Sequence, residues 1–212
     1  MKAPLEHAAA KGNRGLAQKL VGAGADIGQA LHEAVRGGHG DVVNDLLESG
    51  ASVAAKDRAG YGYTPLHVAA REGKIEMMVQ LLLLKGADND AIENNSRCTS
   101  LYLAALHGRT AAALGLLAAG ADVSLRCGDF ERTMLHGAAE DGNVGILRAA
   151  IERGAWTPST QIKIHLFTLP HVSARWRRSM CSWRLGRSSK HWVSLAVHLF
   201  ILLPASLVVK AC

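Results

Sequence analysis

The chain has 212 residues, 49% of them hydrophobic, and carries a formal net charge of +6 at pH 7. It contains no Gly-rich phosphate loop, nucleophile elbow or metalloprotease helix, so the sequence offers no catalytic centre. Its four cysteines, Cys98, Cys127, Cys181 and Cys212, lack C-x-x-C spacing and follow no secretory signal. We therefore expect free thiols, and neither a zinc site nor a disulfide framework.

A block of fixed spacing recurs five times. Each block has a Leu, Ala three residues later, Gly at the seventh position and a Gly-Ala pair at about the nineteenth. The blocks begin at Leu5, Leu31, Leu66, Leu101 and Leu135, and the Gly-Ala pairs lie at 24–25, 50–51, 86–87, 120–121 and 154–155. A period of this size is typical of a repeat array, which makes binding, and not catalysis, the first hypothesis.

The first two blocks predict two helix pairs. In each, a short first helix ends at a glycine, Gly12 or Gly38, because glycine adopts the positive φ of a helix end at little cost. A second helix follows, with apolar side chains on one face. Only twenty-six residues separate Leu5 from Leu31, so the first pair lacks room for a joining β-hairpin loop and is expected to cap the array.

The third block has the clearest helix start. The segment Thr64-Pro65-Leu66 supplies an N-cap hydroxyl, a proline at the first helical position and the first buried side chain, in that order. Gly73 is predicted to end this helix, and a second helix is predicted at about 76–85. Because this block is one residue longer than the others, we expect a bulge or a lengthened last turn at 81–84.

The fourth and fifth blocks repeat the pattern, with small residues at Ala104-Ala105 and Ala138-Ala139. Neither helix of such a pair could bury its apolar face alone, so the pairs must stack. Two motifs recur at the block boundaries: Thr64-Pro65-Leu66-His67 with its relative Thr133-Met134-Leu135-His136, and Gly86-Ala87-Asp88 with its relative Gly120-Ala121-Asp122.

These motifs resemble the ankyrin repeat, and the resemblance covers residues 1–155. It implies an all-α solenoid of stacked antiparallel helix pairs joined by β-hairpin loops. The implied repeats lie at about 1–27, 28–60, 61–95, 96–129 and 130–155. It also implies that the recurring His32, His67 and His136 hydrogen-bond within and between repeats, so that a metal-binding ladder is disfavoured.

The resemblance further implies a protein partner and no catalytic residue, cofactor, metal or small-molecule substrate. The partner would contact the exposed face of the first helices and three finger loops, the first finger at 54–63, the second at 88–98 and the third at 122–132. The candidate contact residues are Lys56, Arg58, Tyr61, Tyr63, Arg71, Glu72, Asn94, Arg97, Leu106, His107, Arg126, Phe130, Arg132, Glu140 and Asp141. Tyr, Phe and Arg are frequent in interface hot spots, although Tyr63 and Phe130 equally suit packing at hairpin bases.

The composition changes sharply at residue 156. The first 155 residues contain 16 Lys and Arg against 18 Asp and Glu, whereas residues 156–212 contain eight Lys and Arg and no acid. An apolar run at 192–209, about eighteen residues long, is near the lower limit for a membrane anchor, but it contains His198 and Pro204. The basic stretch at 175–190 would favour nucleic acid, yet it matches no nucleic-acid-binding module.

A different hypothesis explains this tail. When the codons are shifted by one base, Ile164 to Thr168 permit Thr-Pro-Leu-His, followed in register by two Ala and a Gly. Val197 to Ile201 permit Thr-Pro-Leu-His again. We interpret residues 156–212 as further repeats translated out of frame, and we expect them to be poorly ordered.

The sequence therefore predicts a cytoplasmic or nuclear scaffold or adaptor that binds a protein without catalysis. The alternative is an adaptor anchored to a membrane by residues 192–209. An enzyme is expected only if the chain belongs to a longer protein with a catalytic domain elsewhere.

Overall fold

The computed structural model describes residues 3–73, 82–129 and 132–153, which form paired helices. The first helices of the pairs are α1 (Pro4–Ala10), α3 (Ala30–Gly37), α5 (Pro65–Glu72), α7 (Ser100–Leu106) and α9 (Met134–Asp141). The second helices are α2 (Arg14–Gly22), α4 (Gly40–Glu48), α8 (Thr110–Ala118) and α10 (Val144–Glu152). The described residues contain no strand, only two isolated antiparallel bridges, Ile92 with Thr99 and Cys127 with Arg132. The predicted all-α solenoid of stacked helix pairs is thereby confirmed.

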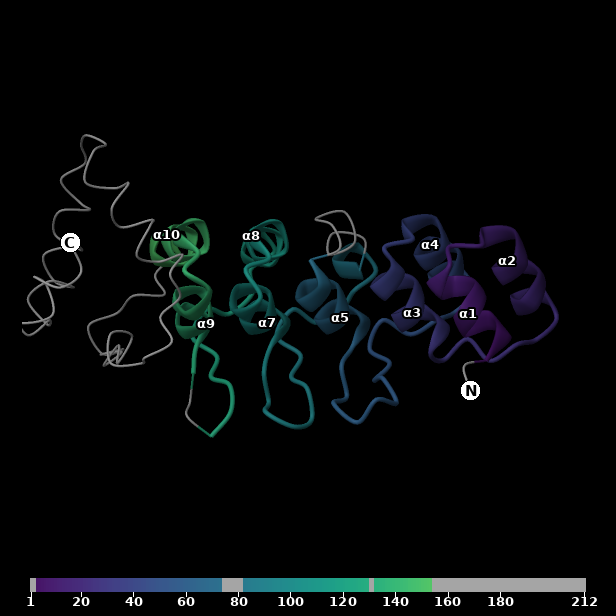
Figure 1. Ribbon diagram of the computed structural model, residues 1–212, viewed down its shortest axis with the longest axis horizontal. Coiled ribbons are helices and arrows are strands. Elements are labelled where there is room, and N and C mark those ends of the chain that lie inside the picture. The colour runs from purple at the N-terminus through teal and green to yellow at the C-terminus, as the bar shows by residue number, and fades with distance from the viewer. Residues whose placement is uncertain (1–2, 74–81, 130–131, 154–212) are drawn as a thin grey trace, which may run out of the picture.

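The helices form two layers (Figure 1). The first helices lie in one row, with α1 against α3, α3 against α5, α5 against α7 and α7 against α9. The second helices lie in a parallel row above them, and the loops that precede α5, α7 and α9 project below. In this view the first-helix layer thus lies between the second helices and the loops.

Helix ends are set by local side chains, as the sequence predicted for α5. Thr64 has an extended backbone, its Oγ1 accepts from His67 N at 3.5 Å, and Pro65 occupies the first helical position. Gly73 then ends the helix in the left-handed region, with φ 66°. A Cβ at this position would overlap the side chain of Arg109, so glycine meets both a conformational and a packing requirement.

The core consists of leucines and alanines that recur at repeat spacing. Leu31, Leu66 and Leu101 are at most 1% exposed, and the alanines three residues after each are fully buried. Burying one leucine contributes about 1.5–3 kcal/mol relative to leaving it exposed. Alanine contributes less area, but its small side chain lets neighbouring first helices approach closely.

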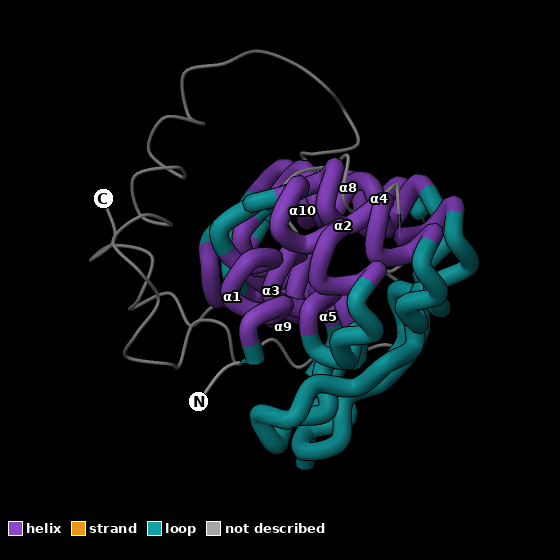
Figure 2. Tube along the Cα trace, turned by 90° about the vertical axis from the view of Figure 1, so that its right-hand side faces the viewer, coloured by secondary structure: helices purple, strands orange, loops and turns teal. Residues whose placement is uncertain are grey.

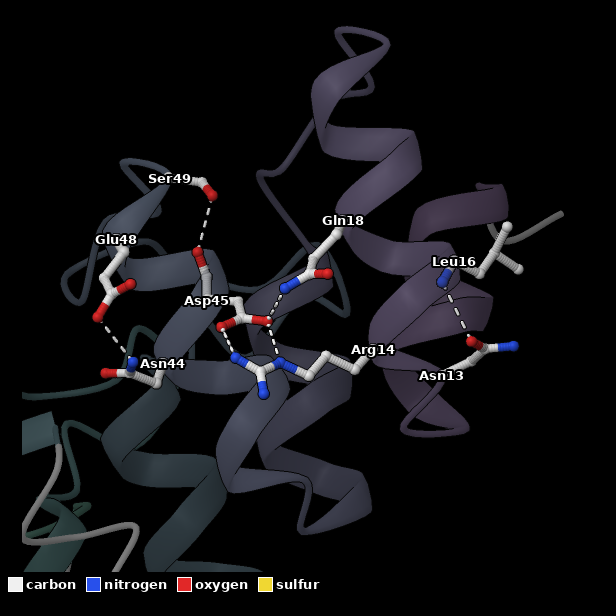
Figure 3. Close-up of polar contacts among 8 residues, drawn as sticks. All are labelled: Asn13, Arg14, Leu16, Gln18, Asn44, Asp45, Glu48 and Ser49. Carbon is white, nitrogen blue, oxygen red and sulfur yellow. Dashed lines mark hydrogen bonds and ion pairs between the residues drawn. The ribbon is translucent and has the colours of Figure 1, made fainter.

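Polar contacts join α2 to α4, the first two helices of the second-helix layer (Figure 3). Arg14 donates to both carboxylate oxygens of Asp45, at 2.6 and 2.8 Å, and Gln18 donates to one of them at 2.9 Å. The hydrogen bond from Arg14 lowers the pKa of Asp45. Asn13 begins α2 by accepting from Leu16 N at 3.1 Å. These exposed contacts orient α2 against α4 more than they stabilise the array.

Several expectations fall wholly or partly outside the described residues. Of the helix predicted at 76–85, the structure describes only its end, in which Leu82 is buried and Leu84 is 85% exposed. Phe130 and residues 156–212 lie outside the described ranges, and with them all three hypotheses for the tail. Among the residues that are described, no helix is long and apolar enough to cross a bilayer.

Candidate partner-binding surface

The three fingers lie together on one side of the array. Viewed along the solenoid, they gather below the first helices, on the side away from the second-helix layer (Figure 2). Each finger leads into a first helix, namely α5, α7 and α9. The link between α2 and α3, residues 23–29, is shorter than the segments that carry the fingers.

The first finger is closed at its base and held by the preceding repeat. Asp57 N donates to Tyr63 O at 2.9 Å, and Tyr63 N donates to the Asp57 carboxylate at 3.0 Å. The Gln29 amide donates to Lys56 O at 3.2 Å and accepts from Arg58 N at 3.1 Å. Gln29 directly precedes α3, as Thr64 directly precedes α5. The Gln29 side chain therefore anchors the first finger, whereas the Thr64 side chain caps its own helix.

The second finger is organised by a buried acid that sequence reasoning missed. Glu93 is 4% exposed, and its carboxylate accepts from the backbone N–H groups of Asn95 (2.7 Å), Ser96 (2.5 Å) and Cys98 (3.3 Å). This arrangement holds the finger tip, where Arg97 has φ 55°, the left-handed region. An acid in a polar loop gives no sequence signal for such burial.

In the third finger, Cys127 and Arg132 form the base. Their backbones exchange hydrogen bonds, Cys127 N to Arg132 O at 2.7 Å and Arg132 N to Cys127 O at 2.9 Å. The Arg132 guanidinium also lies 3.0 Å from the carboxylate of Glu140 in α9. Two predicted contact residues are therefore paired with each other. A partner would have to break this exposed ion pair or contact both of its side chains together.

Neighbouring fingers are hydrogen-bonded to each other. Asn94 N donates to Tyr61 O at 2.8 Å, and Lys56 Nζ donates to Asn94 Oδ1 at 2.5 Å. Gly62, with φ 68°, lies so close to the Asn94 amide that a Cβ would overlap it. Between the second and third fingers, Gly128 N donates to Ser96 O at 2.5 Å. The fingers thus form one connected surface.

The prediction of free thiols was wrong for Cys98 and Cys127. These residues form a disulfide that links the second finger to the third, with Cα atoms 4.4 Å apart. They are 29 residues apart in sequence, and only the stacking of adjacent repeats brings them together. Cys181 and Cys212 lie outside the described residues.

Two of the three recurring histidines, His32 and His67, hold the base of the next finger, as the resemblance implied, and His136 contacts Thr133 of its own repeat. His67 donates from Nε2 to Cys98 O at 3.1 Å, and its Nδ1 lies 2.8 Å from the Thr64 hydroxyl. His32 contacts Tyr63 O at 2.9 Å, while its Nδ1 has no hydrogen-bond partner because Gln29 supplies no hydroxyl. Burial lowers the pKa of both histidines. In α7 the equivalent position is occupied by Tyr102.

An aromatic stack connects the first finger to α5. The Tyr61 and Tyr63 rings are stacked with centroids 5.3 Å apart, and Tyr63 also stacks on His67 at 5.9 Å. The Arg71 guanidinium lies over the Tyr63 ring at 5.8 Å. Burial raises the pKa of Tyr63, which is half-buried, whereas Tyr61 is 48% exposed. Tyr63 therefore supports the hairpin base and orients two exposed neighbours.

The described candidate contact residues differ in exposure. Those open to solvent are Lys56, Arg58, Tyr61, Arg71, Asn94, Arg97, His107, Arg126 and Glu140, whereas Tyr63, Glu72, Leu106, Arg132 and Asp141 are half-buried. Leu106 packs on a small cluster of Cys98, Tyr102, Leu103 and Cys127. The described residues contain no cluster of three or more His, Cys, Asp or Glu side chains that could hold a metal ion.

A hollow lies away from the fingers, in the second-helix layer. This hollow, of about 240 Å³ between α2 and α4, is lined by residues that include Ala17, Val21, Val42 and Leu46. Its polar wall contains Asp45, whose carboxylate already accepts from Arg14 and Gln18. Because its one charged side chain is already engaged by Arg14 and Gln18, this hollow is the weaker candidate.

Comparison with known proteins identifies the repeats. Residues 31–127 match the family model described as ankyrin repeats (3 copies). The chain is 34% identical over 128 residues to a transient receptor potential cation channel subfamily A member 1 homolog of Caenorhabditis elegans, covering 60% of this chain and 10% of that protein. A putative ankyrin repeat-containing protein of Treponema pallidum (strain Nichols) is 34% identical over 122 residues, covering 57% of this chain and 39% of the relative. The nuclear factor NF-kappa-B p105 subunit of Gallus gallus is 32% identical over 125 residues, 58% of this chain and 12% of that protein.

The chain thus matches between a tenth and two fifths of the length of these relatives. Ankyrin repeats are generally protein–protein interaction modules and are typically not catalytic.

Proposed function

Because residues 31–127 are ankyrin repeats, we propose that this protein is a non-catalytic scaffold or adaptor that binds a protein partner through its fingers and first-helix layer. One observation carries the proposal: the three fingers are joined by hydrogen bonds and a disulfide into one surface on a single side of the array. The relatives' names, which include a cation channel and a nuclear factor subunit, are consistent with a module that serves proteins of different activities.

Preorganisation supports binding at this surface. Association costs the ordering of flexible loops and side chains, and fingers that are already fixed lose less entropy when a partner docks. Glu93 and the bond between Asn94 N and Tyr61 O fix the backbone of the second finger. The side chains they present, Tyr61 and Arg97, are exposed and of types that dominate interface hot spots.

The test begins by identifying a partner with the full chain and then titrates that purified partner by calorimetry. The finger variant is Tyr61→Ala with Arg97→Asn, since asparagine tolerates the left-handed backbone of position 97. The matched control is Lys19→Ala with Glu48→Ala, two exposed changes on α2 and α4. We expect the finger variant to bind at least about tenfold more weakly, because truncating one hot-spot residue typically costs more than 1 kcal/mol.

The control variant should bind as the parent does. Equal affinity of the finger variant and the parent would contradict the proposal. Loss of binding in the control alone would move the partner site to the second-helix layer.

A further inference from the structure

The disulfide between Cys98 and Cys127 lies inside the candidate partner surface. Cys98 is the last residue of the second finger, directly before the N-cap Thr99, and Cys127 lies at the base of the third. Both side chains are buried, with 6% and 5% exposure. Their Cα separation of 4.4 Å lies within the range that a disulfide spans. The bond therefore joins two loops, not two helices.

The disulfide occurs in the repeat pair that lacks a histidine contact between its two repeats. His32 holds the base of the first finger through Tyr63 O, and His67 holds the base of the second through Cys98 O. In α7 the equivalent residue is Tyr102, which belongs to the same small buried cluster as both cysteines. The first and second fingers are thus each held by a histidine of the preceding repeat, whereas the third finger is held by a covalent bond to the second.

The helical array does not depend on this bond. The large core cluster, which extends from Leu5 to Ala150, contains neither cysteine. Cys98 and Cys127 belong to a separate small cluster with Tyr102 and Leu103. The backbone bonds of the two fingers, such as Gly128 N to Ser96 O, need no sulfur bond either. Breaking the disulfide would therefore loosen the fingers relative to each other and leave the stacked helices in place.

We propose that Cys98 and Cys127 form a reversible redox-modification site that locks the second and third fingers together, with a small-molecule disulfide such as oxidised glutathione as the co-reactant. Any effect of this disulfide on partner binding rests on the proposed function. The thiol–disulfide exchange and the restraint on the two fingers do not.

The exchange proceeds in two balanced steps. The thiolate of one cysteine attacks a sulfur of the small disulfide, forms a mixed disulfide and releases one small thiolate. The second cysteine, as its thiolate, then attacks the sulfur of the first, forms the Cys98–Cys127 bond and releases the second small thiolate. Overall, two protein thiols lose two protons and two electrons, and one small disulfide takes them up to become two small thiols. Excess small thiol reverses the sequence.

The experiment uses the full chain with Cys181→Ser and Cys212→Ser, so that the other two thiols cannot exchange. The reduced protein is equilibrated in glutathione buffers of rising oxidised fraction, quenched with acid, alkylated and mapped by mass spectrometry. We expect one linked peptide pair, containing Cys98 and Cys127, that disappears when the native protein is returned to reduced glutathione. Cys98→Ser in the same background is the matched control and should form no link.

Amide exchange reports the locking without any partner. We expect the amides of Cys127 and Gly128 to exchange roughly tenfold or more slowly in the oxidised protein, because a cross-link restricts opening of the loops. Amides of α3 and α4 should exchange equally in both states. The proposal is overturned if no link forms at any glutathione ratio, if the native link resists reduction, or if reduction exposes α3 and α4 as well. Failure of the partner titration would leave these readouts unaffected, so the two proposals fail separately.

Discussion

The imidazole of His67 in α5 donates from Nε2 to the carbonyl oxygen of Cys98, 3.1 Å away at the base of the next finger. Its other nitrogen, Nδ1, accepts from the Thr64 hydroxyl at 2.8 Å. One buried ring therefore satisfies the helix start of its own repeat and the loop of the following repeat. Local capping and the stacking of neighbours are coupled through a single neutral side chain.

Replacing this ring should destabilise the array. His67→Ala removes the acceptor of the Thr64 hydroxyl proton and one of the two hydrogen bonds to the Cys98 carbonyl, whose other donor is Glu93 N. A buried group left unsatisfied costs about 1–3 kcal/mol, and a lost hydrogen bond costs about 1 kcal/mol. We expect the free energy of unfolding, measured in urea, to fall by about 2–4 kcal/mol. His7→Ala, at an exposed position of α1, is the control and should change little. A His67→Ala protein as stable as the control would show that these bonds are not needed.

Stability should also depend on pH between neutrality and pH 5. Burial lowers the pKa of His32, His67 and His136 below the usual 6.5, so the folded protein keeps them neutral where the unfolded chain binds protons. The contribution of these neutral histidines to the free energy of unfolding is complete above pH 6.5 and decreases as the pH falls below 6.5. Urea unfolding at pH 7.5 and pH 5.5 checks this expectation. His67→Gln should show a smaller decrease, and equal stability of the parent at both pH values would refute the argument.

Leucine truncation should separate the core from the surface. Leu66 is fully buried in α5, whereas Leu84 is 85% exposed. Leu66→Ala removes buried methyl groups and leaves a cavity, so we expect a loss of about 2–5 kcal/mol in the free energy of unfolding. Leu84→Ala should stay within about 0.5 kcal/mol of the parent, because surface substitutions usually do. Thermal and urea unfolding of the two variants give the comparison, which fails if their losses are alike.

Glu93 should control the order of the second finger. Glu93→Ala removes the acceptor of three backbone N–H groups, and we expect the amides of Ser96 and Cys98 to exchange faster. An opening free energy lowered by about 1–3 kcal/mol is expected for losing such buried bonds. Glu93→Gln retains one acceptor oxygen and should lie between the parent and the alanine variant. Exchange rates in α4 serve as the internal reference, and unchanged rates at Ser96 would mean that the finger is held by other contacts.

The predicted contact surface combines sequence information with contacts that appear only in the fold. The fingers and most of their exposed residues, such as Tyr61 and Arg97, follow from the repeat register, because a loop of known position must present its tip to solvent. That Tyr63 stacks between Tyr61 and His67 under Arg71 could not be predicted. The sequence gives the order of these residues but not the rotamers and loop paths that bring their rings together.

The sequence by itself determined the array. A proline at the first helical position, glycines at the ends of the first helices and alanines at fixed intervals act within a few residues of themselves, so their effects can be predicted locally. Only the tertiary structure decided that Cys98 binds Cys127, that Glu93 is buried and that Gln29 anchors a finger. The contacts of Cys98 and Gln29 join residues about thirty positions apart, and the burial of Glu93 depends on how a loop folds over it. These features arise from the register in which whole repeats stack, which no short segment of the chain specifies.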